Sequence, residues 1–470
     1  MKKRPYPMKF IYSCFLVLFA ISGLKAQDQE KGNYLDDFNI LVGSLFELHP
    51  KLYTNITKDE FDTDVANISQ RLLINSSRPK AIYMMQELFY KLGNSHAGNV
   101  SVFEDLGITK ALPFSVYIID HDLYIRNYPR DTTLNGTKIN AIGNTSAARL
   151  IDSLKIFFPS DGNIPVISCN LQPLFNNLYG FFCAERDTFL LDTEKGPMKL
   201  AAAVRGDKIF EEVILKRAEM YFGADRFLKK EIHPDYGYFR FIGFAHSYKE
   251  FEIEKEYNAF IKEANEKQLK AIVIDLRNNN GGDPYVMGRM TALLSDHPFR
   301  LFERVLITET GVPFYMRYMN NHSTYRVRHL KSKEMGDLRE VVRLEQGLKI
   351  IQPSPERFKG KIYIITGSIT QSSSTMMCKY LQGQPNVVFV GSEPIGAINY
   401  FWASSHCQIT LPELKTKFSF GMELLELKKY SSNKEKPGGL IPDHVISYTI
   451  EERLQKKDKE MEFIIGDLQQ

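Results

Sequence analysis

Two polar turns carry the residues whose types and spacing could do chemistry. The first is Asn278-Asn279-Asn280-Gly281-Gly282-Asp283, and the second is Gly367 to Thr375, which contains Ser372 and Ser373. Paired glycines let backbone N–H groups approach a ligand and face a developing negative charge. A serine hydroxyl before a helix lies at the positive end of that helix. Together the turns would suit attack by Ser372 on a carbonyl group. Taken alone, the serine run is more typical of a helix cap. The paired glycines are as typical of a tight turn as of a ligand-binding turn.

A nucleophilic serine needs a base, and position must choose among the ten histidines. His96 follows a helical segment in the small polar turn Asn94-Ser95-His96-Ala97-Gly98, as a presented side chain would. The alternative is a histidine that only interacts with the helix dipole. Four others are expected to be structural or packing residues: His49, His246, His406 and His444. No His-Glu-x-x-His pattern occurs, so a zinc hydrolase is not expected, and neither a metal nor a cofactor is predicted.

The elements around these turns change in character along the chain. Residues 34–92 have helical periodicity, with a capping box at Thr57-Lys58-Asp59-Glu60. Residues 110–200 contain short β-branched and aromatic runs. From residue 236, continuous apolar strands at 271–276, 361–366 and 387–392 alternate with helices, which predicts a parallel sheet covered by helices. Reacting groups collect at the carboxyl ends of such strands, where both polar turns lie. Residues 300–350 are predicted to be a loop-rich insertion.

Five motifs stand in an order that resembles the tail-specific (C-terminal processing) serine peptidase family. They are the helical segment that ends in Lys91-Leu-Gly-Asn-Ser-His96, the strand and turn Ile272–Gly282, Lys361–Gly367 with Thr370-Gln-Ser372-Ser, Val390–Gly396, and Gly439-Leu-Ile-Pro-Asp443. The first resembles the branch related to the tricorn protease core. The resemblance covers residues 236–455 well. It implies an α/β fold with a ClpP/crotonase-like catalytic core, and a PDZ-like domain that only Gly136–Gly143 supports.

The resemblance also implies roles for individual residues. Ser372 matches the nucleophile, and the N–H groups of Gly281 or Gly282 and of Ser373 match the oxyanion hole. One branch uses a lysine base, but Ala397 stands at that place. The tricorn-like branch uses a histidine, which His96 matches, and places a glutamate where Glu435 is one residue out of register. Ser95 would help to orient the His96 imidazole.

The first 26 residues are predicted to be a signal peptide. Lys2, Lys3, Arg4 and Lys9 precede an apolar run, Phe10–Leu24, which is shorter than the roughly 20 residues that span a bilayer. A retained membrane anchor is the alternative. The protein is therefore expected to be exported, either periplasmic or secreted, with no stable membrane insertion after the leader is removed. The rest divides into an N-terminal helical segment (27–108), a β-rich, PDZ-like domain (109–232) and the catalytic domain (233–470).

Charge and cysteine content exclude some classes of protein. Five of the 60 basic side chains lie in the leader, which leaves 55 against 56 acidic ones and no field that would recruit nucleic acid. Four cysteines remain after the leader, and they are as compatible with buried thiols as with a Cys169–Cys183 bridge.

The expected function is hydrolysis of peptide or protein substrates through a serine acyl-enzyme. The alternative is a catalytically inactive relative that binds peptides or lipids, and the oligomeric state is left open.

Overall fold

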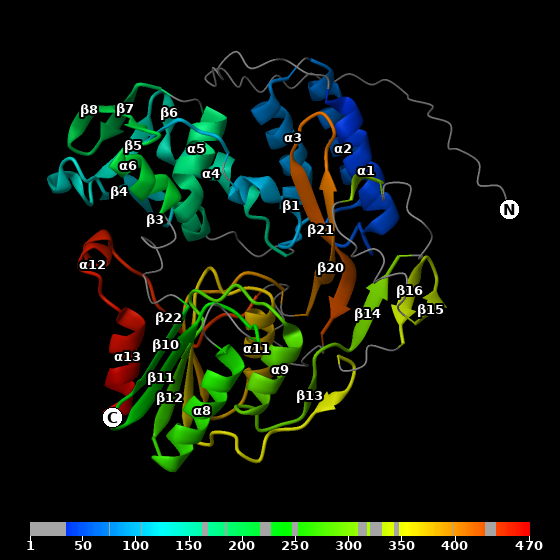
Figure 1. The fold of residues 1–470 in the computed structure, drawn as a ribbon, viewed down its shortest axis with the longest axis vertical. Helices are drawn as coiled ribbons and strands as arrows, with labels where there is room; N and C mark the ends of the chain where they lie inside the picture. The colour runs from blue at the N-terminus through cyan, green and yellow to red at the C-terminus, as the bar shows by residue number, and fades with distance from the viewer. Residues whose placement is uncertain are drawn as a thin grey trace.

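The computed structural model describes residues 34–74, 76–104, 106–161, 168–183, 186–216, 227–246, 252–308, 317–319, 331–342, 347–397, 399–427 and 439–470. The predicted leader, residues 1–26, lies outside these ranges. None of the helices within them is both long and apolar enough to span a bilayer. The described chain forms three main sheets with helices packed around them (Figure 1).

The central sheet is the α/β core that the alternating pattern predicts. Its strand order is β10 (Leu228–Ile232), β11 (Tyr236–Phe241), β12 (Ala271–Asp275), β18 (Lys361–Thr366), β19 (Val387–Gly391) and β22 (His444–Val445). All neighbours from β11 onward are parallel, and only β10 is antiparallel. Every residue of β12 is buried, as expected for a strand covered on both faces.

Helices cover both faces of this sheet. One face packs against α8 (Ile253–Glu266), α9 (Pro284–Ala292) and α11 (Ser373–Leu381), and the other packs against α13 (Lys459–Leu468) (Figure 1). Helix α9 begins at Pro284, with the Asp283 carboxylate accepting hydrogen bonds from the next two amides. The short helix α12 (Ile450–Leu454) precedes α13.

The second sheet joins distant parts of the chain. Its order is β1 (Gly98–Asn99), β21 (Lys417–Glu426), β14 (Arg304–Ile307), β16 (Leu338–Val341) and β15 (Ser332–Met335), with β20 (Tyr400–Thr410) also paired to β21. The N-terminal helices α1 (Leu35–Leu48), α2 (Lys58–Leu73) and α3 (Arg78–Lys91) lie beside it. Residues 300–350 therefore contribute three strands to a sheet, whereas the sequence predicts only an insertion rich in loops.

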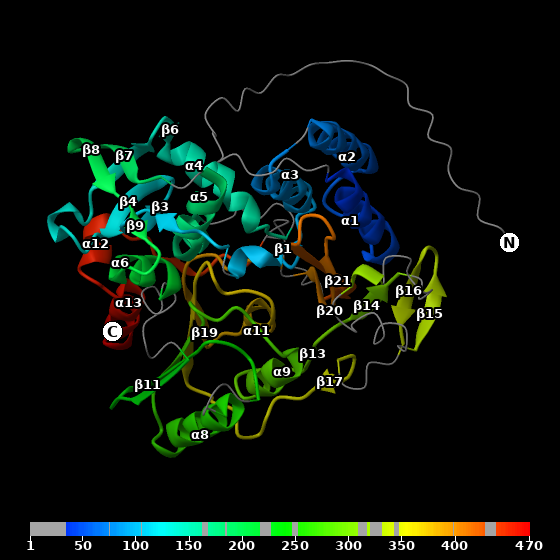
Figure 2. The same ribbon diagram turned by 45° about the horizontal axis from the view of Figure 1, so that its top comes forward.

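The third sheet belongs to the β-rich middle of the chain. Its order is β3 (Ser115–Ile119), β4 (Asp122–Asn127), β5 (Lys138–Ile142), β7 (Thr188–Thr193) and β8 (Gly196–Ala201), with β6 (Thr145–Ser146) paired to β5. Helices α4 (Ala147–Leu154) and α5 (Phe175–Cys183) accompany it. The loop at Gly136 lies against α12, because a Cβ added to this glycine would come within 2.6 Å of Leu454. Figure 2 shows α12 beside β4 of this sheet.

The remaining elements are short. They are β2 (Lys110–Ala111) paired with β9 (Ala203–Val204), β13 (Phe299–Arg300) paired with β17 (Ile350–Ile351), the helical turn α6 (Lys208–Phe210) with a π-helical continuation at Glu211–Leu215, and 3-10 turns at Val100–Phe103, Thr132–Leu134, Lys155–Phe157 and Ser168–Leu174. The whole is a mixed α/β fold with a ClpP-like core, a helical segment before it and a β-rich part between them. This confirms the predicted fold class. The predicted domain boundaries stay predictions.

Candidate active site

The two polar turns meet at the carboxyl edge of the central sheet. Strands β12 and β18 are parallel neighbours, with Ile274 opposite Ile364, so the turns that follow them emerge side by side. The Thr370 hydroxyl donates to the Leu276 carbonyl over 2.7 Å. A Cβ placed on Gly281 would come within 2.7 Å of the Cβ of Ser372. Glycine is therefore required at position 281 because Ser372 fills the space that a side chain would take.

Ser372 lies immediately before α11 in an unusual backbone conformation, with φ 58° and ψ −124°. A positive φ is unfavourable for a residue with a Cβ, and such strain is found mainly where a turn must present a side chain. Ser372 occupies the N-cap position of α11, yet its side chain makes no capping hydrogen bond. A sharp strand-to-helix turn of this kind holds the nucleophile in α/β-hydrolases. The geometry therefore differs from that of an ordinary helix cap.

The three amides predicted to form the oxyanion hole differ in their hydrogen bonding and in whether their residues line the cavity. The Gly281 N–H donates to Asn279 Oδ1 over 3.0 Å, so it is already engaged. Gly282 and Ser373 both line the cavity in front of Ser372. Phe244 N–H donates to Gly281 O, and Asp283 N–H donates to Phe244 O. Because successive amides of an extended chain point to opposite sides, this pattern turns the Gly282 N–H away from Phe244.

A cavity of about 940 Å³ lies in front of these amides and receives side chains from all parts of the chain. Ser95 and His96 come from the loop after α3, Ser372 from the turn before α11, and His406 from β20. Its walls are largely apolar and include Phe157, Phe158, Leu174, Phe302, Phe401 and Leu425. The space is large enough for several residues of an extended peptide.

His96 lies in this cavity under Phe401, with ring centroids 5.9 Å apart and a stacked arrangement. Its backbone N–H donates to Asn94 Oδ1, which fixes the loop. Burial lowers the pKa of His96 to about 4, so the imidazole is neutral near pH 7 and can accept a proton. No direct hydrogen bond joins His96 to Ser372 within the described residues. The two loops are tied instead by Gln371 Nε2, which donates to the Ser95 carbonyl over 3.1 Å.

A buried carboxylate stands behind His96. Ser95 Oγ lies 3.1 Å from His96 Nδ1 and donates to Asp161 Oδ2 over 2.9 Å. The Ser95 and Ala397 amides also donate to Asp161, over 2.7 and 3.2 Å. Burial raises the pKa of Asp161 to about 6. Sequence reasoning missed Asp161, and the available signal was only a polar Ser160-Asp161 step after an apolar segment.

The other predicted or alternative residues lie in different places. Glu435 lies outside the described residues. Ala397, which stands at the position of the lysine base, contacts Asp161 through its amide. His406 lines the cavity, and burial lowers its pKa to about 4. His444 is at the sheet edge in β22, where its ring packs on Phe463.

His49, His246 and the described cysteine side chains do not line this cavity. His49 packs against Trp402 and Phe420, and burial lowers its pKa to about 3. His246 is exposed on the surface. Cys183, Cys378 and Cys407 are free thiols, and the side chain of Cys169 lies outside the description. The described residues include no cluster of three or more His, Cys, Asp or Glu side chains arranged to hold a metal ion.

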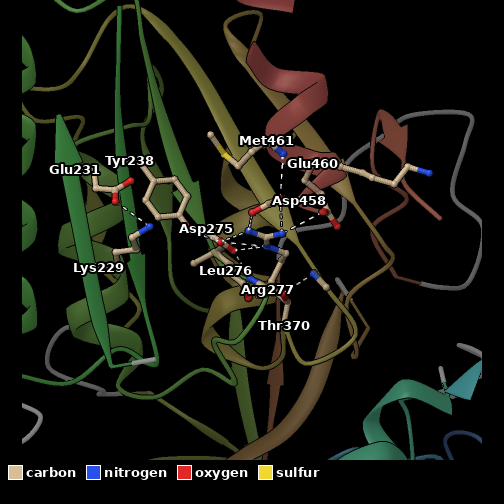
Figure 3. A network of polar contacts seen from close by, with 12 residues as sticks. Lys229, Glu231, Tyr238, Asp275, Leu276, Arg277, Thr370, Asp458, Glu460 and Met461 are labelled. Carbon is tan, nitrogen blue, oxygen red and sulfur yellow. Dashed lines mark hydrogen bonds and ion pairs between the residues drawn. The ribbon is translucent and has the colours of Figure 1, made fainter. Parts of the chain in front are cut away.

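The strand that leads into the glycine turn is anchored by an ionic network (Figure 3). The Arg277 guanidinium bonds to Asp275 over 2.7 Å and to both carboxylate oxygens of Asp458 over 2.8 and 2.9 Å. It also reaches Glu460 over 3.1 Å. Burial alone would raise the pKa of Asp275, but Arg277 keeps it below its ordinary value. The start of α13 thus holds the chain directly before Asn278.

Residues 235–404 match the family model described as peptidase family S41. This stretch contains the glycine turn, Ser372 and the first residues of β20, and it ends two residues before His406. Residues 235–404 are thus similar to an S41 peptidase domain. The predicted resemblance to the tail-specific serine peptidases is confirmed, and peptide-bond hydrolysis is the activity of that family.

Solved structures extend the likeness beyond the S41 domain. A point mutant of CPAF is similar to this chain with a TM-score of 0.62 at 12% identity, covering 91% of this chain and 95% of that one. Mature CPAF complexed with lactacystin gives a TM-score of 0.62 at 13% identity, covering 93% and 97%. The helical segment, the β-rich middle and the S41 domain therefore share one overall fold with CPAF. No curated protein sequence matches the chain.

Proposed function

We propose that this protein is an exported serine peptidase that cleaves peptide bonds through an acyl-enzyme on Ser372. The observation that carries the proposal is the strained Ser372 turn, whose hydroxyl is not used as a helix cap and which faces the cavity beside Gly282, Ser373 and His96. The S41 match over this stretch supports the peptidase class.

The proposed reaction proceeds in two steps. His96 accepts the proton of Ser372 Oγ, and the oxygen attacks the carbonyl carbon of the scissile peptide. The Gly282 and Ser373 N–H groups hold the oxyanion of the tetrahedral intermediate. The C–N bond breaks, the imidazolium returns the proton to the leaving amine, and water then hydrolyses the ester in the same way. Catalytic hydrogen bonds are often long without substrate, so the base closes on Ser372 when a peptide fills the cavity.

The nucleophile is tested with a fluorophosphonate probe. Wild type should be labelled, and Ser372→Ala should lose both labelling and peptide hydrolysis. Ser404→Ala is the matched control, because Ser404 lines the same cavity on β20, and it should still be labelled. Labelling of Ser372→Ala would refute the assignment. A wild-type protein that reacts with no probe but still binds peptides or lipids would be an inactive binding relative.

The base is tested by His96→Ala, which should abolish turnover while the protein still folds. His406→Ala is the comparison, since His406 lies 5.9 Å from His96 between ring centroids in the same cavity. Near-normal activity of His96→Ala would transfer the role of base to His406, because His444 does not line the cavity.

Export rests on the leader at residues 1–26 and on nothing in the described structure. N-terminal sequencing of protein from the periplasm or medium should begin near residue 27. A cytoplasmic protein that retains Met1 would overturn this part of the proposal without affecting the chemistry.

A further inference from the structure

We infer that Asp161 is the positioning residue of this active site and orients the His96 base through the hydroxyl of Ser95. The inference rests on the proposed peptidase function. It gives the third position of the catalytic array to a carboxylate from the β-rich middle of the chain, and not to Glu435 near the C-terminus. Asp161 is 1% exposed and does not line the cavity, so its effect on the reaction must pass through other groups.

The contacts form one continuous chain from the carboxylate to the imidazole. Asp161 Oδ2 accepts from Ser95 Oγ over 2.9 Å, and the same hydroxyl lies 3.1 Å from His96 Nδ1. Ser95 has a single hydroxyl hydrogen, and an ionised carboxylate can only accept. The hydrogen therefore points to Asp161, and the Ser95 oxygen accepts from His96 Nδ1–H. This arrangement selects one tautomer and leaves the lone pair on His96 Nε2.

The carboxylate itself is held from two further directions. The Ser95 N–H donates to Oδ1 over 2.7 Å, and the Ala397 N–H donates to Oδ2 over 3.2 Å. A Cβ on Gly396 would come within 3.2 Å of Oδ2, so glycine leaves room for the approach. Three parts of the chain thus meet at this carboxylate: the segment after α4 that carries it, the loop after α3, and the loop between β19 and β20. Its position fixes the Ser95 hydroxyl and hence the ring of His96.

The test combines two single variants with their double variant. Asp161→Asn should lower kcat on the order of 10²-fold, the scale of an acid–base contribution, with KM changed little. Ser95→Ala should lower kcat similarly, and the double variant should fall no further, because both changes break one chain of contacts. Asp152→Asn is the control, since Asp152 is an exposed acid on α4 that pairs with Lys155. Its kcat should match wild type.

A spectroscopic readout separates positioning from mere structural support. In the full chain labelled with ¹⁵N-histidine, His96 should show the Nδ1–H tautomer, and this signal should shift toward the other tautomer in Asp161→Asn. The buried His49 signal should stay unchanged in the same sample, which verifies that the variant is folded. Unchanged His96 shifts, or additive losses of kcat in the double variant, would overturn the inference.

The outcomes distinguish this inference from the proposed function. Hydrolysis that survives Ser372→Ala refutes the peptidase mechanism as a whole. An inactive Ser372→Ala together with a fully active Asp161→Asn refutes only the role of Asp161.

Discussion

Gly281 and Ser372 form a contact in which each residue restricts the other. Gly281 has a φ of 105°, and Ser372 has a φ of 58°, although it carries a side chain. The virtual Cβ of Gly281 also lies 2.9 Å from the Gln371 carbonyl, which is backbone and cannot rotate away. Glycine at position 281 thus allows the strained Ser372 turn to lie directly against the glycine turn, Asn278–Asp283.

Gly281→Ala should therefore lower kcat by about 10²-fold or more, the loss typical of a misplaced oxyanion donor. Gly206→Ala is the matched control, because Gly206 has a similar φ of 99° but nothing within 4 Å of an added Cβ. It carries the same backbone strain without the collision. Steady-state kinetics on a peptide substrate should show the loss only in Gly281→Ala, and equal losses in both variants would contradict this reasoning.

The buried Asp161 predicts a specific dependence of stability on pH. Its pKa is about 6 when folded and 3.8 in the reference state, so the folded protein favours the neutral acid. The stability that the neutral Asp161 side chain contributes is fully present below pH 3.8 and is lost as the pH rises through 6. Relative to Asp161→Asn, wild type should lose about 1.4 kcal/mol of unfolding free energy between pH 5 and pH 8. Urea unfolding at both pH values measures the difference, and a constant difference would contradict it.

Among individual residues, the sequence predicts Ser372, His96 and Ser95 from their motifs, and all three line one cavity. It could not predict Asp161, because that position depends on how the middle of the chain folds against the loop after α3. It also could not separate Gly281 from Gly282. That distinction depends on the Asn279 side chain, which takes the Gly281 amide.

Among the elements, α13 stabilises the strand end that leads into the glycine turn, although it lies far from that turn in the sequence. Asp458 precedes this helix and Glu460 lies in its first turn, and both bind Arg277 (Figure 3). Tyr238 on β11 adds a hydrogen bond to Asp275 over 2.6 Å. Asp275 is fully buried, so its charge depends on Arg277. The helix therefore stabilises the strand end from which the glycine turn departs.

Arg277→Ala should cost about 3–5 kcal/mol of unfolding free energy, because it leaves a buried carboxylate without its partner. Arg289→Ala is the comparison, since Arg289 makes a bidentate ion pair with Glu254 at 45% side-chain exposure. Arg289→Ala should lower the free energy of unfolding by less than about 1 kcal/mol. Chemical denaturation of both variants provides the test, and equal costs would show that the network adds no special stability.

A strand can be predicted from the sequence when its own residues carry the pattern, and not when it forms through pairing with a distant part of the chain. Strands β12, β18 and β19 are continuous apolar runs, so their burial can be inferred from composition alone. Strands β15 and β16 are short and mostly half-exposed, and they lack such a run. They form because β14 already pairs with β21, from a distant part of the chain. That pairing is a tertiary property and leaves no periodic signal in residues 300–350.

For the whole molecule, buried histidines predict sensitivity to acid. Burial lowers the pKa values of His49 to about 3 and of His96 and His406 to about 4. The unfolded chain takes up these protons near pH 6.5, so stability is full above that pH and falls below it. Between pH 7.5 and pH 5.5, each of these three histidines should lower the free energy of unfolding by about 1.4 kcal/mol. Asp161 should raise it by about 0.8 kcal/mol over the same interval and so offset part of this loss.

The urea midpoint should therefore fall clearly between pH 7.5 and pH 5.5. His49→Gln should make this decline shallower, because one group no longer takes up a proton on unfolding. Comparing slopes and not absolute midpoints removes the packing cost of the substitution itself. A midpoint that does not change with pH would contradict the predicted burial of these rings.

The convergence of three chain segments on Asp161 also bears on when the enzyme becomes active. Residue 95 is synthesised first, residue 161 next and residue 397 last, so the carboxylate acquires its full set of donors only after residue 397 has been made. A growing or partly folded copy has Ser372 or His96 without a complete array. The proposed activity therefore depends on the folding of all three segments together.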